Sequence, residues 1–179
     1  MTTPELDDAA LEFANKVFDA ARNGDADALK QWLEQGLPAN LRNHNGDSLL
    51  MLACYHGHMD AVKMLLEHGA DTELLNERGQ SPLAGVAFKG YTELVPVLLS
   101  HGAKVDGHGE DGRTPLLIAA MFNRTDIMEI VLRDGANILH KDAAGNDVFA
   151  CAKTLHAHDA LAWLELYLAG DDKDFFELS

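Results

Sequence analysis

Apolar residues recur three and four positions apart along most of the chain, in short stretches that polar, glycine-containing segments separate. This spacing is typical of one face of an α-helix. In one stretch the face consists of Leu116, Ala119 and Ala120, where the small alanines allow a neighbouring helix to approach closely. A second apolar face follows, formed by Val62, Leu65 and Leu66, matched by Val95, Leu98 and Leu99, and then by Ile130, Val131 and Leu132. The pattern predicts pairs of short helices joined by loops.

Glycines recur with a period of thirty-three residues, in three ladders that share one register. The first ladder comprises Gly46, Gly79, Gly112 and Gly145. The second comprises Gly24, Gly57 and Gly90 and lapses to Asn123 and His156, and the third comprises Gly36, Gly69, Gly102 and Gly135. A fixed period of this length is the signature of a repeat protein, so each helix pair is one copy of a repeated unit.

Residues around the helices predict where each helix begins and ends. Ser81-Pro82 and Thr114-Pro115 each supply a capping hydroxyl followed by proline at the first helical position. The glycines of the second and third ladders are expected to end the two helices in the left-handed conformation. Pro96 is tolerated if Glu93 opens its helix, because the proline then lies in the first turn.

The motifs within the unit resemble those of the ankyrin repeat. Gly-Arg-Thr-Pro-Leu stands at 112–116, Gly57-His58 follows a first helix, and Leu-Leu-x-x-Gly-Ala ends a second helix at 65–70 and 98–103. The resemblance covers about residues 13–170 and implies an all-α solenoid of about five helix-turn-helix repeats with β-hairpin-like fingers. One departure is that the histidine common after Thr-Pro-Leu is replaced, by Met51, Ala84, Leu117 and Ala150.

The two end repeats are expected to be modified caps, because one face of each meets water instead of a neighbour. Residues 5–35 lack the Thr-Pro-Leu entry and begin with a longer amphipathic helix, whose apolar positions are Leu6, Phe13, Val17 and Ala20. The last repeat has Asn-Asp-Val at the entry. We expect one domain over residues 1–170 and a frayed acidic tail at 171–179, with repeats at about 5–40, 41–74, 75–107, 108–138 and 139–170.

The composition limits the classes of partner. The 179 residues include 29 acidic and 14 basic side chains, for a net charge of −15. This charge disfavours nucleic acid and anionic membrane surfaces and favours a partner with a basic surface, unless the surplus acid is only a solvated face. No signal peptide and no apolar stretch of about 20 residues is visible, so we expect a cytoplasmic protein. Cys54 and Cys151 lie nearly three repeats apart, too far for a disulfide, and are expected to be buried thiols.

Metal binding and catalysis have little support in the sequence. Two histidine pairs, His56 with His58 and His156 with His158, are two residues apart and are expected to diverge. His68 and His101 are about one helix spacing apart, and a third ligand beside His108 and His140 is not indicated, whereas zinc needs three or four. No common catalytic motif is present. We therefore expect no metal site, no cofactor and no catalytic residues.

The repeat period predicts a binding face. Tyr55, Phe88 and Met121 are thirty-three residues apart, at positions just before the first helix ends, and Phe122 adjoins the last of them. Large apolar groups at positions expected to be exposed favour a binding surface. The remaining expected contacts flank this ladder, in the fingers and the helix ends: His44, Asp47, His56, Glu77, Arg78, Lys89, Glu110, Asp111 and Arg113. The alternative is that the large side chains lie flat and shield the inner helices.

The resemblance implies a protein–protein interaction module, a monomer that binds a protein partner through the concave face of fingers and inner helices. Two alternatives stay open at this point. One is an inhibitor or self-protection protein that occludes a specific enzyme, and the other is a metal-binding or enzymatic protein. The convex face is the other surface that could bind.

Overall fold

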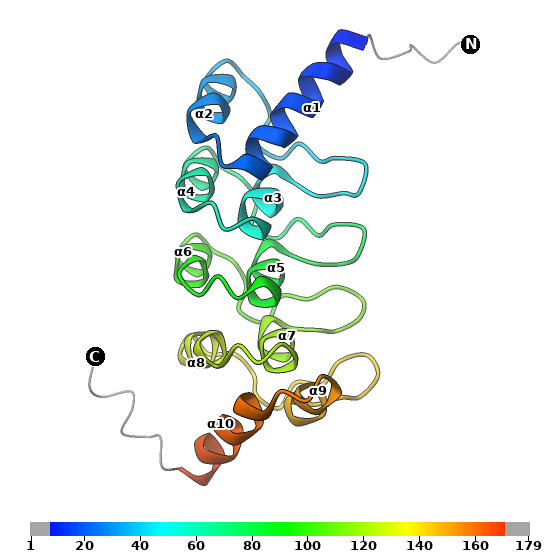
Figure 1. Ribbon diagram of the computed structural model, residues 1–179, viewed down its shortest axis with the longest axis vertical. Coiled ribbons are helices and arrows are strands. Elements are labelled where there is room, and N and C mark those ends of the chain that lie inside the picture. Colours follow the sequence, from blue (N-terminus) through cyan, green and yellow to red (C-terminus); the bar gives the residue numbers. More distant parts are fainter. Residues whose placement is uncertain (1–7, 171–179) are drawn as a thin grey trace. The chain divides into compact units, whose positions relative to one another are not determined.

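The computed structural model describes residues 8–170, and the expected frayed tail and Leu6 lie outside this range. Over the described residues the chain forms only short helices, turns and one isolated bridge between Arg42 and Ser48. The helices are α1 (Asp8–Asn23), α2 (Ala26–Glu34), α3 (Leu49–Tyr55), α4 (Met59–Glu67), α5 (Pro82–Lys89), α6 (Leu94–Ser100), α7 (Pro115–Met121), α8 (Thr125–Arg133), α9 (Val148–Thr154) and α10 (His158–Ala169) (Figure 1). The predicted all-α repeat fold is confirmed.

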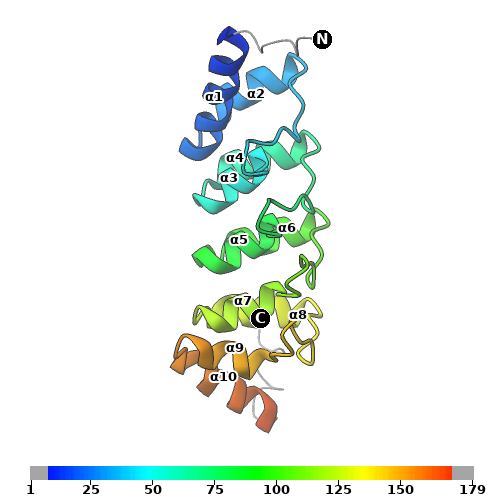
Figure 2. The same cartoon turned by 90° about the vertical axis from the view of Figure 1, so that its right-hand side faces the viewer.

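The helices fall into two compact units, residues 1–71 with α1 to α4 and residues 72–179 with α5 to α10. In the first unit α1 packs on α3 and α2 packs on α4. In the second unit α7 packs between α5 and α9, while α8 contacts α6 and α10. Figure 2 shows α5, α7 and α9 stacked side by side, and in Figure 1 the loops that precede them project to the same side. The expectation of one domain over 1–170 stays a prediction.

The first helix of each complete repeat begins at a hydroxyl cap, as the sequence predicts. The Ser48, Ser81 and Thr114 side chains each accept a hydrogen bond from the backbone N–H three residues on, at 3.0, 3.2 and 3.3 Å. Asp147 caps α9 in the same way, at 2.9 Å from the Ala150 nitrogen. All three hydroxyl residues are buried, so these bonds satisfy N–H groups that water cannot reach.

The first helix also ends as predicted, in the left-handed conformation. Gly24, Gly57 and Gly90 have φ of 73°, 76° and 86°. Asn123 and His156 keep this conformation without glycine, with φ of 59° and 56°. Any larger residue at Gly90 would also displace the Arg124 side chain, because a Cβ atom there would lie 2.7 Å from it. The turn geometry therefore persists where the glycine ladder lapses.

The core lies between the paired helices of each unit. Val62, Leu65 and Leu66 are buried, as are Val95 and Leu98, whereas Leu99 is half-buried. In α8 the expected face is shifted, since Ile130 is half-buried and Met128 is fully buried. Met128 stands thirty-three residues after Val95, so the repeat period alone assigns it to the buried face. The apolar run of 130–132 led instead to the wrong assignment of Ile130. Pro96 lies in the first turn of α6 behind Glu93, as predicted.

The helix at the start of the chain corrects one further expectation. Val17 and Ala20 of α1 are buried, but Phe13 is 42% exposed. Its ring meets the Trp32 ring of α2 edge to face, with centroids 5.4 Å apart. Phe13 lies beyond the part of α1 that α3 covers, because α1 has 16 residues and α3 has only seven.

Cys54 and Cys151 are free and buried, which confirms their predicted burial. Burial raises the pKa of the Cys54 thiol, and it raises the pKa of Cys151 to about 11. Both thiols are therefore protonated and shielded at neutral pH. Within the described residues, no helix combines the length and the apolar character that crossing a bilayer demands.

Candidate binding surface

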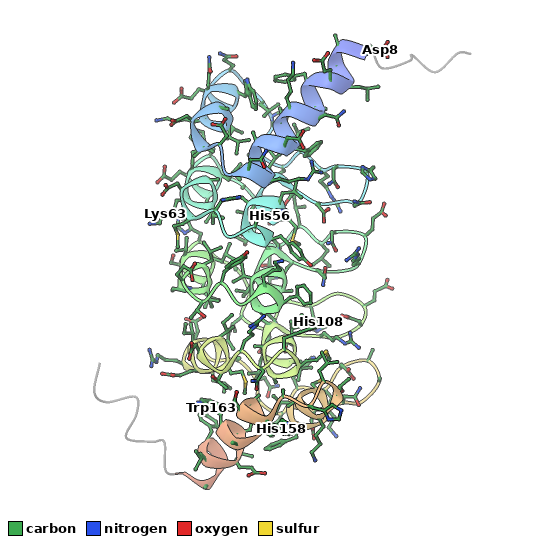
Figure 3. All side chains as sticks on the ribbon, viewed as in Figure 1. Asp8, His56, Lys63, His108, His158 and Trp163 are labelled. Atoms are coloured by element: carbon green, nitrogen blue, oxygen red, sulfur yellow. The ribbon has the colours of Figure 1, made fainter. Side chains whose placement is uncertain are left out.

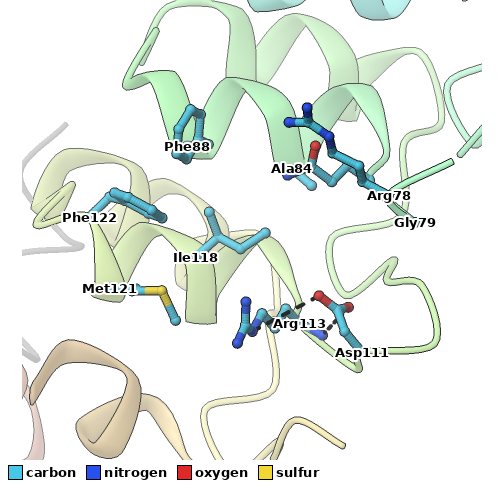
Figure 4. A pocket seen from close by; sticks show the side chains of 10 residues that line it. Arg78, Gly79, Ala84, Phe88, Asp111, Arg113, Ile118, Met121 and Phe122 are labelled. Atoms are coloured by element: carbon cyan, nitrogen blue, oxygen red, sulfur yellow. Dashed lines mark hydrogen bonds and ion pairs between the residues drawn. The ribbon is translucent and has the colours of Figure 1, made fainter. Parts of the chain in front are cut away.

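A pocket of about 270 Å³ opens between α5 and α7 in the second unit (Figure 4). Its apolar wall comes from the two helices, with Phe88 near the end of α5 and Phe122 directly after α7. The two rings meet edge to face, with centroids 4.6 Å apart. Both phenylalanines are half-buried, so each presents part of its ring to solvent.

Local structure fixes the position of Phe88. It occupies the last turn of α5, which Gly90 ends in the left-handed conformation. The Arg124 side chain lies against Gly90, and its guanidinium donates to the Phe88 carbonyl oxygen at 3.5 Å. Because the neighbouring repeat caps this turn, the aromatic pair sits on a supported helix end.

The opposite end of the pocket carries charge. Arg78 comes from the loop before α5, and Asp111 and Arg113 come from the loop before α7. The Arg113 Nε atom lies 4.0 Å from Asp111 and 3.9 Å from Asp142. Among the described residues, Arg78 makes no ion pair within 4.0 Å. Figure 4 shows the two aromatic rings on one side of Ile118, the Arg78 side chain beside Ala84, and the Arg113 side chain on the other side of Ile118 from Arg78.

The remaining wall explains why a pocket exists here. Ala84 and Ile118 lie between the two ends, and Gln80 also lines the pocket. Ala84 occupies the repeat position that holds Met51 and Leu117 in the neighbouring copies. The smaller side chain on α5 leaves space against α7.

Comparison with known proteins matches the chain to the family model described as "Ankyrin repeats (3 copies)", over residues 17–107 and 69–142. The protein belongs to the ankyrin repeat family. A stretch of 53 residues is also 62% identical to a protein of Pseudomonas aeruginosa named as an ankyrin repeat protein, and it covers 30% of this chain. The match spans 31% of the length of that relative. Ankyrin repeats generally mediate protein–protein interactions and are typically not enzymes.

In this ankyrin repeat protein, six residues of the predicted face line the pocket: Arg78, Phe88, Asp111, Arg113, Met121 and Phe122. Met121 corrects an expectation, since it is only 8% exposed and contributes an edge of its side chain. It packs as part of α7, whereas Phe122 carries the exposed apolar surface that the period assigned to position 121. Glu77, Lys89 and Glu110 are exposed but do not line the pocket.

The other predicted contacts belong to the first unit. Tyr55 is half-buried and its ring meets the exposed His56 ring edge to face, with centroids 6.2 Å apart. His44 is exposed in a finger, and Asp47 accepts from the Asn43 side chain at 3.3 Å. The continuation of the ladder from Tyr55 to Phe88 passes from one unit to the other and stays a prediction.

The repeat period places Gln80 on the expected face, but it does not identify Ala84 and Ile118 as lining residues. Ala84 did carry a signal, because a small residue between the larger Met51 and Leu117 of the two neighbouring repeats indicates a gap between helices. Ile118 carried none, because an apolar residue is ordinary within a helix.

The histidines take structural positions. The His108 and His140 rings approach to 5.1 Å between centroids, and each has a ring nitrogen 2.8 Å from a backbone carbonyl oxygen. His58 reaches the Arg22 carbonyl at 2.7 Å and so caps the preceding repeat. Among the described residues, no three His, Cys, Asp or Glu side chains are grouped as metal ligands require.

The expectation that closely spaced histidines diverge is wrong. The His56 and His58 rings are 6.3 Å apart and 19° from parallel, and the His156 and His158 rings are 6.5 Å apart and 21° from parallel. His56 and His58 lie in the turn between α3 and α4, and His156 lies in the turn before α10, of which His158 is the first residue. A turn can bring side chains of residues i and i+2 to the same side, which a helix cannot. His68 and His101 lie in different units, and their separation stays a prediction.

Proposed function

We propose that this protein binds a protein partner through the face formed by α5, α7 and the loops before them. The observation that carries the proposal is the Phe88–Phe122 pair, half-buried at an open pocket and flanked by arginine. Aromatic and arginine side chains are the residues that most often dominate binding energy at interfaces. The edge-to-face pair is already formed without a partner, so little side-chain entropy is lost on binding.

The pocket is too small to be the whole interface. A stable interface covers about 800 Å² on each partner and involves about 20 to 30 residues a side, more than line this pocket, so residues around the pocket must contribute. We include the exposed Glu77, Lys89 and Glu110 in this surrounding rim, where charge mainly chooses the partner and its orientation. Extension of the interface to Tyr55, His56, His44 and Asp47 of the first unit is part of the proposal. We also propose that the protein acts as a monomer in the cytoplasm.

The first prediction is that Phe88→Ala with Phe122→Ala abolishes partner capture. Loss of two central aromatic anchors costs about 2 kcal/mol or more, which is about thirtyfold in affinity. The immobilised wild type and variant are compared for the proteins that they retain from an extract of the source cells. The matched control is Leu139→Ala, which removes an 81% exposed leucine outside the pocket.

Thermal unfolding of both variants checks that the fold survives. Equal capture by wild type and folded double variant would exclude this face and direct the search to the opposite, convex surface. If the captured partner is an enzyme, titration decides between simple binding and inhibition, because only an occluding complex lowers the partner's activity.

A further inference from the structure

We infer that the α5–α7 pocket receives an extended segment of the partner in which an acidic side chain adjoins an aromatic one. The inference rests on the proposed function and specifies the chemistry of the bound segment. It depends on three features of the pocket, namely its size, its charged end and its aromatic end.

The size indicates side chains instead of a free small molecule. The pocket measures about 270 Å³, whereas sites for small molecules occupy about 300 to 1,000 Å³ and enclose the ligand. This pocket is open along the cleft between two helices and bounded by loops at one end. A segment lying across α5 and α7 can place two neighbouring side chains in it.

The charged end favours a carboxylate. Arg78 and Arg113 both line it, and an arginine fork binds a carboxylate with two parallel hydrogen bonds. The contacts of Arg113 with Asp111 and Asp142, at 4.0 and 3.9 Å, are longer than the about 2.7 to 2.9 Å of a charge-assisted hydrogen bond. Both guanidinium groups therefore retain donors for an incoming acid.

The acidic groups nearby do not cancel this preference. Asp142 is buried and its carboxylate accepts hydrogen bonds from Asn146 and Ala144, so these oxygens are already occupied by neutral donors. Asp111 accepts from the Arg113 backbone N–H at 3.0 Å and faces the Arg113 side chain. At physiological ionic strength charges farther than about 8 Å are largely screened, so the groups of the pocket itself decide its preference, and among them Arg78 has no ion-pair partner within the described residues. The partner's remaining surface can still be basic.

The aromatic end specifies the neighbouring residue. Phe88 and Phe122 leave ring surface exposed beside the gap over Ala84 and Ile118. A third ring adds an edge-to-face or stacked contact there, which an aliphatic side chain cannot make. Because both ends belong to one pocket, the acid and the aromatic ring must be close in the partner's sequence.

The test uses the full chain and a fluorescent octapeptide of sequence GSDFFESG. Binding is followed by fluorescence polarisation, with the peptides GSNFFQSG and GSDAAESG as controls for charge and for the rings. We expect Arg78→Glu to weaken binding of GSDFFESG by about tenfold or more. Lys63→Glu, an equal charge change on α4 (Figure 3), should leave binding unchanged.

A coupling between protein and peptide completes the test. GSNFFQSG should bind the wild type more weakly than GSDFFESG, and this difference should vanish on Arg78→Glu if Arg78 contacts the acid. The inference fails if GSDFFESG binds the wild type more weakly than about 1 mM. It also fails if Arg78→Glu and Lys63→Glu weaken binding equally.

The chain itself carries Asp-Phe-Phe-Glu at residues 174–177, outside the described range. A variant that ends at Gly170 is therefore measured in parallel. Equal affinities of the two lengths support a partner segment as the occupant, whereas tighter binding by the shorter chain would assign the pocket to the chain's own sequence.

Failure of the inference and failure of the proposed function give different results. If partner capture requires Phe88 and Phe122 but is unaffected by Arg78→Glu, the binding face stands and the acidic segment is wrong. If the phenylalanines are dispensable for capture, the proposed function itself is wrong, whatever the peptide does.

Discussion

At the scale of single residues, a polar side chain stabilises the finger, the loop before the first helix of a repeat, through hydrogen bonds to the loop backbone. Asn43 and Asn76 each accept hydrogen bonds from the backbone N–H groups two and four residues on, at 2.9 to 3.0 Å. Asp142 does the same with Ala144 and Asn146. In the remaining repeat the corresponding residue is Gly109, because a side chain there would collide with the Gly79 carbonyl oxygen. Close contact between two fingers therefore replaces the side-chain bonds in one repeat.

The charge on Asp142 makes folding stability depend on acid. The Asn146 side-chain hydrogen bond holds the pKa of Asp142 below its ordinary value, and burial only partly opposes this. A carboxyl with a lowered pKa in the folded state contributes stability above its unfolded pKa of about 3.9. That contribution is lost as the pH falls through the lower, folded-state value.

We predict that Asp142→Asn removes this acid-dependent loss. Asparagine keeps the turn, as Asn43 and Asn76 show, but has no proton to bind. Urea unfolding at pH 7 and pH 3 should give a smaller drop in stability for the variant than for the wild type. An equal drop in both would show that the Asp142 carboxylate is not a source of acid sensitivity.

At the scale of elements, side chains join each repeat to the next. Asn40, Glu73 and Asp106 are thirty-three residues apart, and each accepts from the backbone N–H of the residue 31 positions on. The distances are 2.8, 3.0 and, to the nearer oxygen of Asp106, 3.0 Å. These bonds satisfy the loops that follow the second helices, where no helix supplies a partner.

We predict that Asp106→Ala lowers the free energy of unfolding by about 0.5 to 1.5 kcal/mol, the net contribution of one hydrogen bond. Asp106→Asn is the matched control, since Asn40 makes the same contact with an amide oxygen. The change should be near zero for the amide. Equal losses for both substitutions would indicate that charge, and not the acceptor, matters.

At the scale of the whole molecule, contacts between sequential repeats hold each of the two compact units together. Such a chain behaves as a row of units coupled to their nearest neighbours. The expectation of one domain over 1–170 requires that this coupling hold from α1 to α10. Each compact unit contains one tryptophan, Trp32 in the first and Trp163 in the second, so their unfolding can be followed separately.

We predict that Trp32→Phe and Trp163→Phe variants, each reporting on the remaining tryptophan, unfold in urea with coincident transitions. Leu65→Ala in the first unit and Leu98→Ala in the second, both fully buried, should each cost about 2 to 5 kcal/mol. Each should shift both fluorescence transitions together. Separate midpoints would divide the chain into two domains.

Much of the fold follows from the sequence because the same constraint recurs thirty-three residues apart. The caps at Ser81 and Thr114 and the left-handed glycines follow from local backbone chemistry, so they were predictable. Ile130 and Phe13 were assigned wrongly because apolar character alone does not say whether a neighbouring helix covers a residue. Histidines two residues apart were misjudged because a turn, unlike a helix, brings them together.

The binding face was predictable only in part. The period marked Phe88 and the charged loops, but it could not show that Met121 is buried and that Phe122 presents the surface. Nor could it show the gap over Ala84, which depends on the distance between α5 and α7.

The sequence by itself determined the repeat, its helix boundaries and the family, because these depend on residues close together in the chain. The tertiary structure decided which side chains share a pocket. Two arginines from different loops, Phe88 of α5 and Phe122 directly after α7 line one pocket only through packing of successive repeats. Contacts of this kind depend on the separation and rotation of helices, which no local pattern specifies.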